Sequence, residues 1–365
     1  MIGRISLIYC IIRERFSSSI APLFTGVLFF MLRILVWIGQ SLDKVFFLRL
    51  RTIRIERPIV IVGNPRTGST FLQRFLHKQG VGQGQSVLQQ VYPSILLQKI
   101  LRPLTPILER ISPARHHSSL AHQTSLSSIE TDDAGLFLRF LDGFFLYGFI
   151  LTWAEEELTE LVDPDIRPTF ERDFDWWEQS WKRNLFLNQK KRVLAKSFSL
   201  MVNLPDFQKR YPDAKVLVLL RDPLEMIPSA LSLVSGVLEK KFQISELSWE
   251  HRSRFYQRLS TGLLDLLERF VSLWTEGKLQ RDAILLVPYP RLLTDFEGMM
   301  TEVLRFTETP VTVSLNEAIL STAETQRAYQ SKHQYNLEEF GLDAEDLRQK
   351  SAFFYRFMEA ECGGY

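Results

Sequence analysis

The feature that most constrains the fold is a short apolar run at residues 59–62 (IVIV), followed at once by the segment 63–70 (GNPRTGST). A β-branched run of this kind is typical of a buried parallel strand. Glycine and proline end the run, and a helical pattern then extends from Gly68 to Lys78. Strand, glycine-containing loop and helix in this order predict an α/β protein with a P-loop-like turn.

Further strands and helices alternate along the chain. Parallel strands are predicted at 192–197, 215–220 and 283–289. Helices are predicted at roughly 135–152, 173–188, 250–276 and 291–307. This alternation predicts a parallel sheet with helices on both faces. The segment 80–190 is rich in Phe and Trp, and we expect it to form a helical insertion on the acceptor side.

The N-terminal arm differs in charge from the rest of the chain. Residues 1–57 hold nine Lys or Arg and three Asp or Glu, a net charge of +6, and the remainder carries −4. This asymmetry favours an anionic membrane surface over nucleic acid as a partner. No Gly/Pro/Ser-rich linker divides the chain further, so we expect an arm at 1–57 and one catalytic domain at 58–365.

An apolar run at residues 21–39 lies within this arm. Its nineteen residues approach the ~20 that a membrane-spanning helix needs. Arg33 interrupts the run, and a central arginine costs at least ~2.5 kcal/mol on insertion scales. We therefore expect an amphipathic helix that lies in the interface, with Arg33 reaching the headgroups, or one that packs on the protein's own core, rather than a transmembrane anchor.

The two cysteines, Cys10 and Cys362, stand near opposite ends of the chain. They form neither a disulfide framework nor a cluster with metal-ligand spacing, which favours a reducing compartment. We expect a cytoplasmic protein that contacts a membrane through its arm, with no metal and no nucleic-acid partner. The sequence makes no prediction of the oligomeric state.

The loop at 63–70 has the composition of an anion site. Backbone N–H groups of such a loop, together with the positive end of the following helix, point at a bound anion. Gly63 and Gly68 allow the tight turn, and Arg66 adds a positive charge. Hydroxyl donors come from Thr67, Ser69 and Thr70.

The two glycines also have the spacing of a Walker A loop. In that loop a lysine binds the β- and γ-phosphates, but this chain has Ser69 at the lysine position. The sequence therefore disfavours an ATPase or GTPase.

A second motif follows the strand predicted at 215–220. Arg221 ends this strand, Pro223 opens the next helix, and Ser229 follows Arg221 by eight residues. A guanidinium backed by a hydroxyl recognises a phosphate well. Taken alone, the segment would also fit a simple strand-to-helix turn with proline at the first helical position.

Together these motifs resemble those of sulfotransferases that use 3'-phosphoadenosine-5'-phosphosulfate (PAPS), in particular the broad bacterial group with a PRTGTT loop. The resemblance extends over about residues 58–357. Cytosolic members usually have lysine at the position of Arg66. The resemblance implies that Arg221 and Ser229 bind the 3'-phosphate of PAPS. It implies that the phosphosulfate is bound by Pro65, Arg66, Thr67, Gly68, Ser69 and Thr70.

Two weaker similarities extend this resemblance. Lys196, in LAKS (194–197), resembles a lysine that balances charge on the leaving phosphate, although Phe198 stands where the family usually has proline. Residues 331–338 resemble a late basic loop over the donor, from which Arg327 and Lys332 would reach the 3'-phosphate.

The resemblance implies in-line transfer of a sulfonate to an acceptor hydroxyl or amine, with Arg66 and Lys196 stabilising the charge. As the general base we predict Glu130, with His117 and Asp132 as alternatives and His251 as a more distant one. The phenylalanines between 137 and 149 favour a small-molecule or lipid-like acceptor. The alternatives are a catalytically idle nucleotide-binding membrane protein and a P-loop nucleotide kinase.

Overall fold

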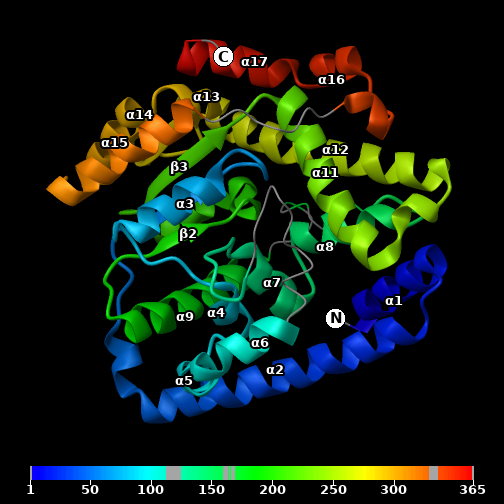
Figure 1. Cartoon of the computed structure of the whole chain (residues 1–365), viewed down its shortest axis with the longest axis horizontal. Coiled ribbons are helices and arrows are strands. Elements are labelled where there is room, and N and C mark those ends of the chain that lie inside the picture. The colour runs from blue at the N-terminus through cyan, green and yellow to red at the C-terminus, as the bar shows by residue number, and fades with distance from the viewer. Residues whose placement is uncertain are drawn as a thin grey trace. The chain divides into compact units, whose positions relative to one another are not determined.

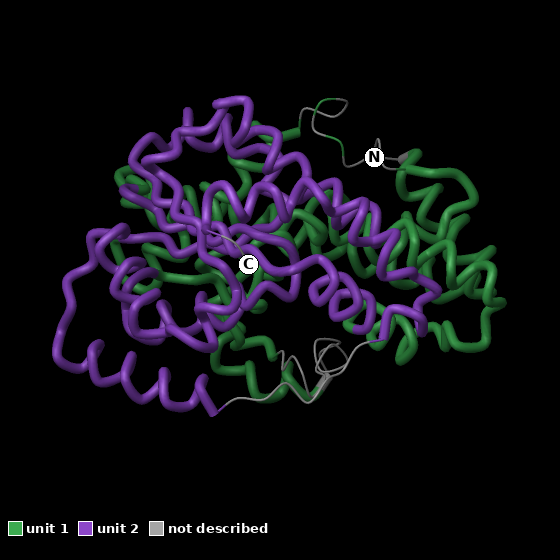
Figure 2. Tube along the Cα trace, turned by 90° about the horizontal axis from the view of Figure 1, so that it is seen from above, with its two compact units in different colours: residues 1–55, 83–191, 233–259 green, residues 56–82, 192–232, 260–365 purple. Residues whose placement is uncertain are grey.

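The computed structural model describes residues 2–111, 125–158, 163, 165, 169–328 and 336–363. The chain divides into two compact units (Figure 2). Unit 1 comprises residues 1–55, 83–191 and 233–259, and unit 2 comprises 56–82, 192–232 and 260–365. The predicted division into an arm at 1–57 and a catalytic domain at 58–365 stays a prediction.

Unit 2 contains a parallel sheet of four strands (Figure 1). The strands are β1 (Ile59–Val62), β2 (Leu194–Lys196), β3 (Lys215–Leu220) and β4 (Ile284–Pro288). Their order is β2-β1-β3-β4, so β1 lies between β2 and β3. Ile61 pairs with Lys196 on one side and with Leu217 on the other. The structure thus confirms the predicted α/β fold and each of the four predicted strands.

Helices cover this sheet and bury its apolar side chains. The core joins the strands to the helices through residues such as Ile59, Leu72, Leu219 and Met300. The helices wholly within unit 2 are α3 (Ser69–Lys78), α10 (Leu204–Arg210), α13 (Tyr289–Thr294), α14 (Phe296–Phe306), α15 (Val313–Arg327), α16 (Ala344–Lys350) and α17 (Ala352–Cys362). Two longer helices, α11 (Pro223–Phe242) and α12 (Trp249–Thr275), contribute residues to both units.

Unit 1 is helical. Its helices are α1 (Ile2–Phe16), α2 (Ile20–Phe46), α4 (Val87–Val91), α5 (Ile95–Leu101), α6 (Thr105–Ile111), α7 (Asp133–Phe140), α8 (Phe144–Phe149) and α9 (Phe170–Asn188). Short 3-10 turns complete the chain: Leu48–Thr52, Arg102–Leu104, Leu151–Trp153 and Ile244–Glu246 in unit 1, and Ser199–Asn203, Arg281–Ala283 and Leu337–Phe340 in unit 2. The mostly helical insertion predicted at 80–190 is therefore present.

Two of the predicted helices are each broken into two. The helix expected at 135–152 ends where Leu141 (φ 50°) and Gly143 (φ 82°) take left-handed conformations, and α7 and α8 meet at a bend of 78°. The helix expected at 291–307 breaks at Asp295, whose carboxylate accepts the N–H of Gly298 at 3.1 Å and caps α14. Helical periodicity continues across both breaks, so the pattern alone did not reveal them.

Candidate functional site

The loop after β1 begins at a position that only glycine can occupy. Gly63 has φ +139°, and a Cβ atom there would lie 2.4 Å from the backbone oxygen of Leu219 in β3. Two further left-handed residues, Arg66 (φ 71°) and Gly68 (φ 84°), turn the chain into α3. For a residue with a side chain this conformation costs roughly 1–2 kcal/mol, so the surrounding contacts must hold Arg66 in place.

Those contacts bring together the two predicted phosphate motifs. The Nε of Arg66 donates to Oγ of Ser229 at 2.9 Å, across 163 residues of sequence. A guanidinium N–H of Arg221 donates to the carbonyl oxygen of Arg66 at 2.8 Å. Ser229 itself is buried in α11. The loop after β1 and the Arg–Ser pair after β3 therefore form one site at the carboxyl edge of the sheet.

The guanidinium of Arg221 is fixed on two sides. It lies over the ring of Tyr289, with Cζ 4.2 Å from the ring centroid, and it donates through two nitrogens to Oε2 of Glu225 at 3.1 and 3.2 Å. A cation over an aromatic face is held by the ring quadrupole. Glu225 is 58% exposed in its side chain, whereas Arg221 is 14% exposed. The carboxylate therefore occupies the outer side of the arginine, where an incoming anion would compete with it.

Lys196 supplies a third cation at the same edge. It ends β2, next to β1, and it is buried. Its Nζ donates to Oγ1 of Thr70, in the first turn of α3, at 2.7 Å. Because parallel strands end at one edge of a sheet, β2, β1 and β3 place Lys196, the loop and Arg221 along one line.

Asn64 and Thr67 give the loop its shape. The buried hydroxyl of Thr67 donates to the carbonyl of Asn64 at 2.8 Å, and the Asn64 amide donates to the carbonyl of Leu263 in α12 at 2.8 Å. These bonds fix the loop from inside. Pro65 precedes Arg66 in the loop, and Ser69 is the first residue of α3, where free N–H groups face outward along the helix axis.

A tyrosine of α17 holds the turn between β3 and α11. The hydroxyl of Tyr355 donates to Asp222 at 2.7 Å, and the same carboxylate oxygen accepts the N–H of Leu224 at 2.9 Å. Burial, and then the bond to Asp222, raise the pKa of Tyr355 above its ordinary value. These two bonds fix the orientation of Asp222, next to Arg221.

Among the residues of this site that were not singled out from the sequence are Asn64, Glu225 and Tyr289. Glu225 stands four residues after Arg221 at the start of a predicted helix, a spacing that pairs opposite charges, so it could have been found. Asn64 lies inside the loop motif. Tyr289 follows β4, and its place under Arg221 depends on the strand order.

Of the other predicted residues, the structure describes Arg327, Glu130, Asp132 and His251. At the end of α15, Arg327 donates to Glu297 at 2.6 Å, and none of its described contacts reaches the loop. Lys332 and His117 fall outside the described residues. The other predicted bases belong to unit 1.

Glu130 and Asp132 are buried within unit 1. Asp132 accepts the indole N–H of Trp181 at 3.3 Å, and the backbone of Glu130 is bonded to Gln85 and Gln90. The ring nitrogens of His251, also in unit 1, lie 2.8 Å from Arg15 and 3.1 Å from Ser248.

Comparison with known proteins gives a consistent result. A sequence profile described as the Sulfotransferase family matches residues 58–313. The crystal structure of sulfotransferase STF1 from Mycobacterium tuberculosis H37Rv superposes with a TM-score of 0.71 at 17% identity, covering 92% of this chain and 87% of that one. Sulfotransferase STF9 from Mycobacterium avium gives a TM-score of 0.69 at 16% identity, covering 87% and 80%. No curated protein sequence matches the chain.

The backbone of Gly63 yields a test of the loop geometry. We expect Gly63→Ala to lower the free energy of unfolding by more than Gly80→Ala, measured by urea denaturation. Both glycines have positive φ, which costs roughly 1–2 kcal/mol for alanine. A Cβ at Gly80 meets nothing within 4 Å, whereas one at Gly63 meets the Leu219 oxygen and should cost a further ~1–3 kcal/mol. Equal losses in the two variants would contradict the close approach of loop and β3.

Proposed function

The chain belongs to the sulfotransferase family, and on that basis we propose that it transfers the sulfonate of PAPS to a hydroxyl or amine of an acceptor. The family and the fold support sulfonate transfer in general. One observation supports PAPS as the donor. Arg66 in the loop contacts both Ser229 and Arg221, so groups suited to a phosphosulfate and to a second phosphate lie in one site.

The charges of the site suit this donor. PAPS carries a 5'-phosphosulfate and a separate 3'-phosphate, and the site offers the cations Arg66, Lys196 and Arg221 along one sheet edge. We assign the phosphosulfate to residues 65–70 and the 3'-phosphate to Arg221 and Ser229. A nucleotide without a 3'-phosphate would leave Arg221 paired with Glu225. The site would therefore bind such a nucleotide less tightly than PAPS.

The residues would act by position and charge. The acceptor oxygen or nitrogen forms a bond to sulfur while the bond from sulfur to the 5'-phosphate oxygen breaks, and the electron pair leaves with that oxygen. Lys196 and Arg66 stabilise the negative charge that develops there. We propose Glu130 as the base that takes the acceptor proton, with Asp132 and His117 as alternatives.

The acceptor is proposed to be a small hydrophobic or lipid-like molecule. The support is the aromatic content of α7 and α8, in which Phe137, Phe140, Phe145 and Phe149 are half-buried rather than sealed in the core. We also propose that the protein is cytoplasmic and takes PAPS from that compartment.

Binding of 3'-phosphoadenosine-5'-phosphate (PAP) tests the donor site. By calorimetry we expect PAP to bind at least tenfold more tightly than ADP or ATP-magnesium. Arg221→Ala should weaken PAP binding by about tenfold to a hundredfold, because a charge-assisted bond to phosphate is lost. Arg305→Ala, an exposed arginine on α14, should leave it unchanged. Preference for ATP-magnesium would contradict the proposal.

Glu225 gives a test in the opposite direction. Its carboxylate pairs with Arg221, and a half-exposed pair of this kind is worth about 0–1 kcal/mol. Glu225→Gln removes both the competitor and a repulsive charge, so we expect PAP to bind up to about fivefold more tightly while ADP affinity does not change. If PAP bound more weakly to this variant, Arg221 would not be the receptor of the 3'-phosphate.

The base is tested by kinetics with an alcohol acceptor identified from a panel. Glu130→Gln should lower kcat by about 10²–10⁴-fold and leave PAP affinity unchanged, because only proton transfer is lost. Unchanged PAP affinity also shows that the variant folds. A normal kcat in Glu130→Gln together with a loss in Asp132→Asn would assign the base to Asp132 instead.

A further inference from the structure

We propose that unit 1 is a membrane-docking platform, in which α2 lies in the plane of an anionic bilayer with one side in the lipid and the other fixed to the protein. The proposal concerns unit 1 alone and does not depend on the donor site. It begins with the helix itself. Among the described residues, α2 is the helix whose length and apolar composition would allow it to cross a membrane.

One stripe of α2 is fixed to the rest of unit 1 from Phe29 to Asp43. The residues of this stripe recur every three or four positions, which places them on one side of a helix: Phe29, Arg33, Val36, Gln40 and Asp43. The ring of Phe29 packs edge-on against Phe137 at 6.0 Å, and Arg33 donates to the carbonyl of Leu138 at 3.4 Å. The charge inside the apolar run is therefore turned toward the protein, as in the predicted alternative of a helix packed on the core, and not toward the headgroups.

The far end of this stripe is held by a buried ion pair. Asp43 is fully buried, and it accepts Nε of Arg183 at 2.9 Å, the hydroxyl of Ser94 at 3.1 Å and the first N–H groups of α5. One turn earlier, Gly39 lies so close to α5 that a Cβ atom would meet Ser94 at 2.7 Å. A membrane-spanning helix would have to leave these contacts, and Asp43 and Arg183 would each lose a buried partner.

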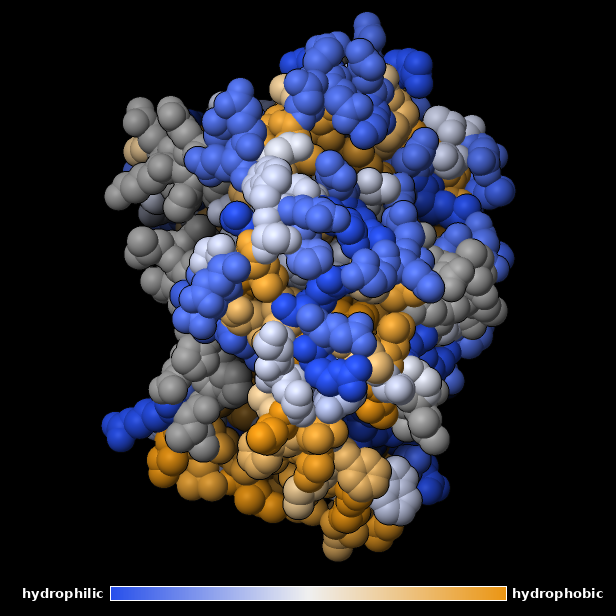
Figure 3. Space-filling view, turned by 90° about the vertical axis from the view of Figure 1, so that its right-hand side faces the viewer, coloured by the Kyte–Doolittle hydropathy of each residue, from blue (hydrophilic) through white to orange (hydrophobic). Residues whose placement is uncertain are grey.

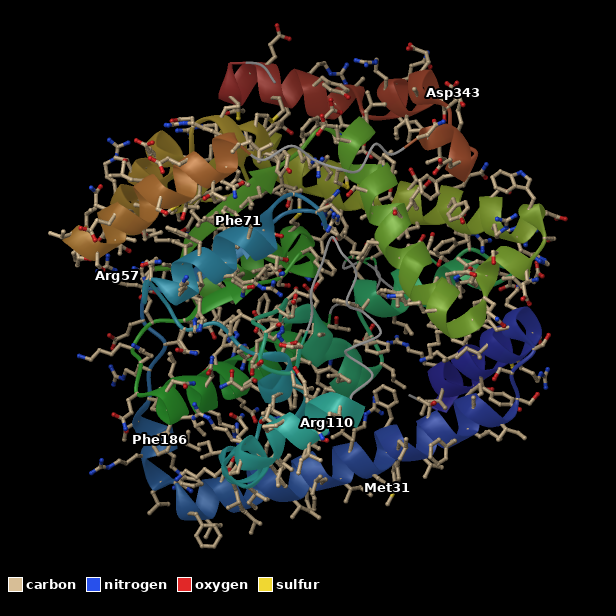
Figure 4. All side chains as sticks on the ribbon, in the orientation of Figure 1. Met31, Arg57, Phe71, Arg110, Phe186 and Asp343 are labelled. Carbon is tan, nitrogen blue, oxygen red and sulfur yellow. The ribbon has the colours of Figure 1, made fainter. Side chains whose placement is uncertain are left out.

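The other side of α2 is apolar and exposed. From Ile20 to Asp43, every residue of the exposed class is uncharged and apolar. The large ones with more than half of their surface exposed are Ile20, Leu23, Phe24, Val27, Phe30, Met31 and Trp37. They gather in one apolar patch over α2 (Figure 3), and side chains project from α2 away from α5 and α6, with Met31 near the middle of the helix (Figure 4). Water is a poor solvent for such a surface.

The charges next to the exposed face of α2 favour a lipid surface over a second copy of the protein as the partner of that face. At the end of α2 and in the turn that follows it, four cations are exposed and make no ion pair within the described residues: Lys44, Arg49, Arg51 and Arg54. The acids nearest to them in sequence are Asp43, which is buried on Arg183, and Glu56, which is exposed, so the segment keeps a positive charge. An apolar helix face bordered by unpaired cations suits anionic headgroups, whereas a second copy would place like charges together.

Vesicle flotation of the full chain tests the platform. We expect binding to phosphatidylcholine vesicles that contain phosphatidylserine, and weaker binding to vesicles of phosphatidylcholine alone. Phe24→Ser with Phe30→Ser should reduce the bound fraction at least tenfold. Val311→Ser with Val313→Ser, which removes equally exposed apolar side chains from unit 2, should not change it. Arg49→Gln with Arg51→Gln should weaken binding to the anionic vesicles only, by about fivefold for each charge.

Tryptophan quenching by brominated lipids separates an in-plane helix from a spanning one. Trp37 is 62% exposed and Trp249 is 49% exposed, so quenching should disappear in Trp37→Phe and persist in Trp249→Phe. A tryptophan placed at position 30 by Phe30→Trp, in the Trp37→Phe background, should report the same shallow depth as Trp37. A spanning helix would put position 30 about 10 Å deeper and would overturn the proposal. Failure to bind vesicles, or a solution dimer that Phe24→Ser with Phe30→Ser dissociates, would overturn it equally.

Discussion

The donor site depends on two hydrogen bonds of Arg66. Its side chain bonds Ser229 and its carbonyl accepts Arg221, so one residue in a left-handed conformation joins the loop after β1 to the motif after β3. Without the close approach that Gly63 permits, the loop and β3 could not lie so near each other. The anion site is thus a consequence of packing two neighbouring parallel strands, with a third cation, Lys196, placed by the next strand.

Two cations of the site, Arg221 and Lys196, are held in place by neighbouring side chains. Arg221 rests between Tyr289 and Glu225, and Lys196 is bonded to a neutral hydroxyl. An incoming anion would therefore have to displace the Glu225 carboxylate from Arg221. Tyr289 and Glu225 thus keep the guanidinium of Arg221 oriented before a ligand binds. Such preorganised charges are what the transfer of a sulfonate requires.

Much of this could be predicted from the sequence, because the signals were local. Each strand was a continuous apolar run, and Arg66, Arg221 and Ser229 were singled out because their motifs resemble those of sulfotransferases. What the sequence did not reveal depended on other parts of the chain. The break after α7 depends on the left-handed backbone of Leu141. The position of Tyr289 depends on the strand order. The direction of the Arg33 side chain depends on the packing of α2 against α7. Glu130 and Asp132 were chosen by position in the sequence, and their role as bases stays a prediction.

The most direct test of the account is a crystal structure of the protein with PAP bound. The account predicts 5'-phosphate oxygens within hydrogen-bond distance of the N–H groups of residues 66–70. It predicts the 3'-phosphate on Arg221 and Ser229, with Arg221 released from Glu225. A nucleotide bound in the reverse orientation, or bound elsewhere while Arg221 stays paired with Glu225, would contradict it.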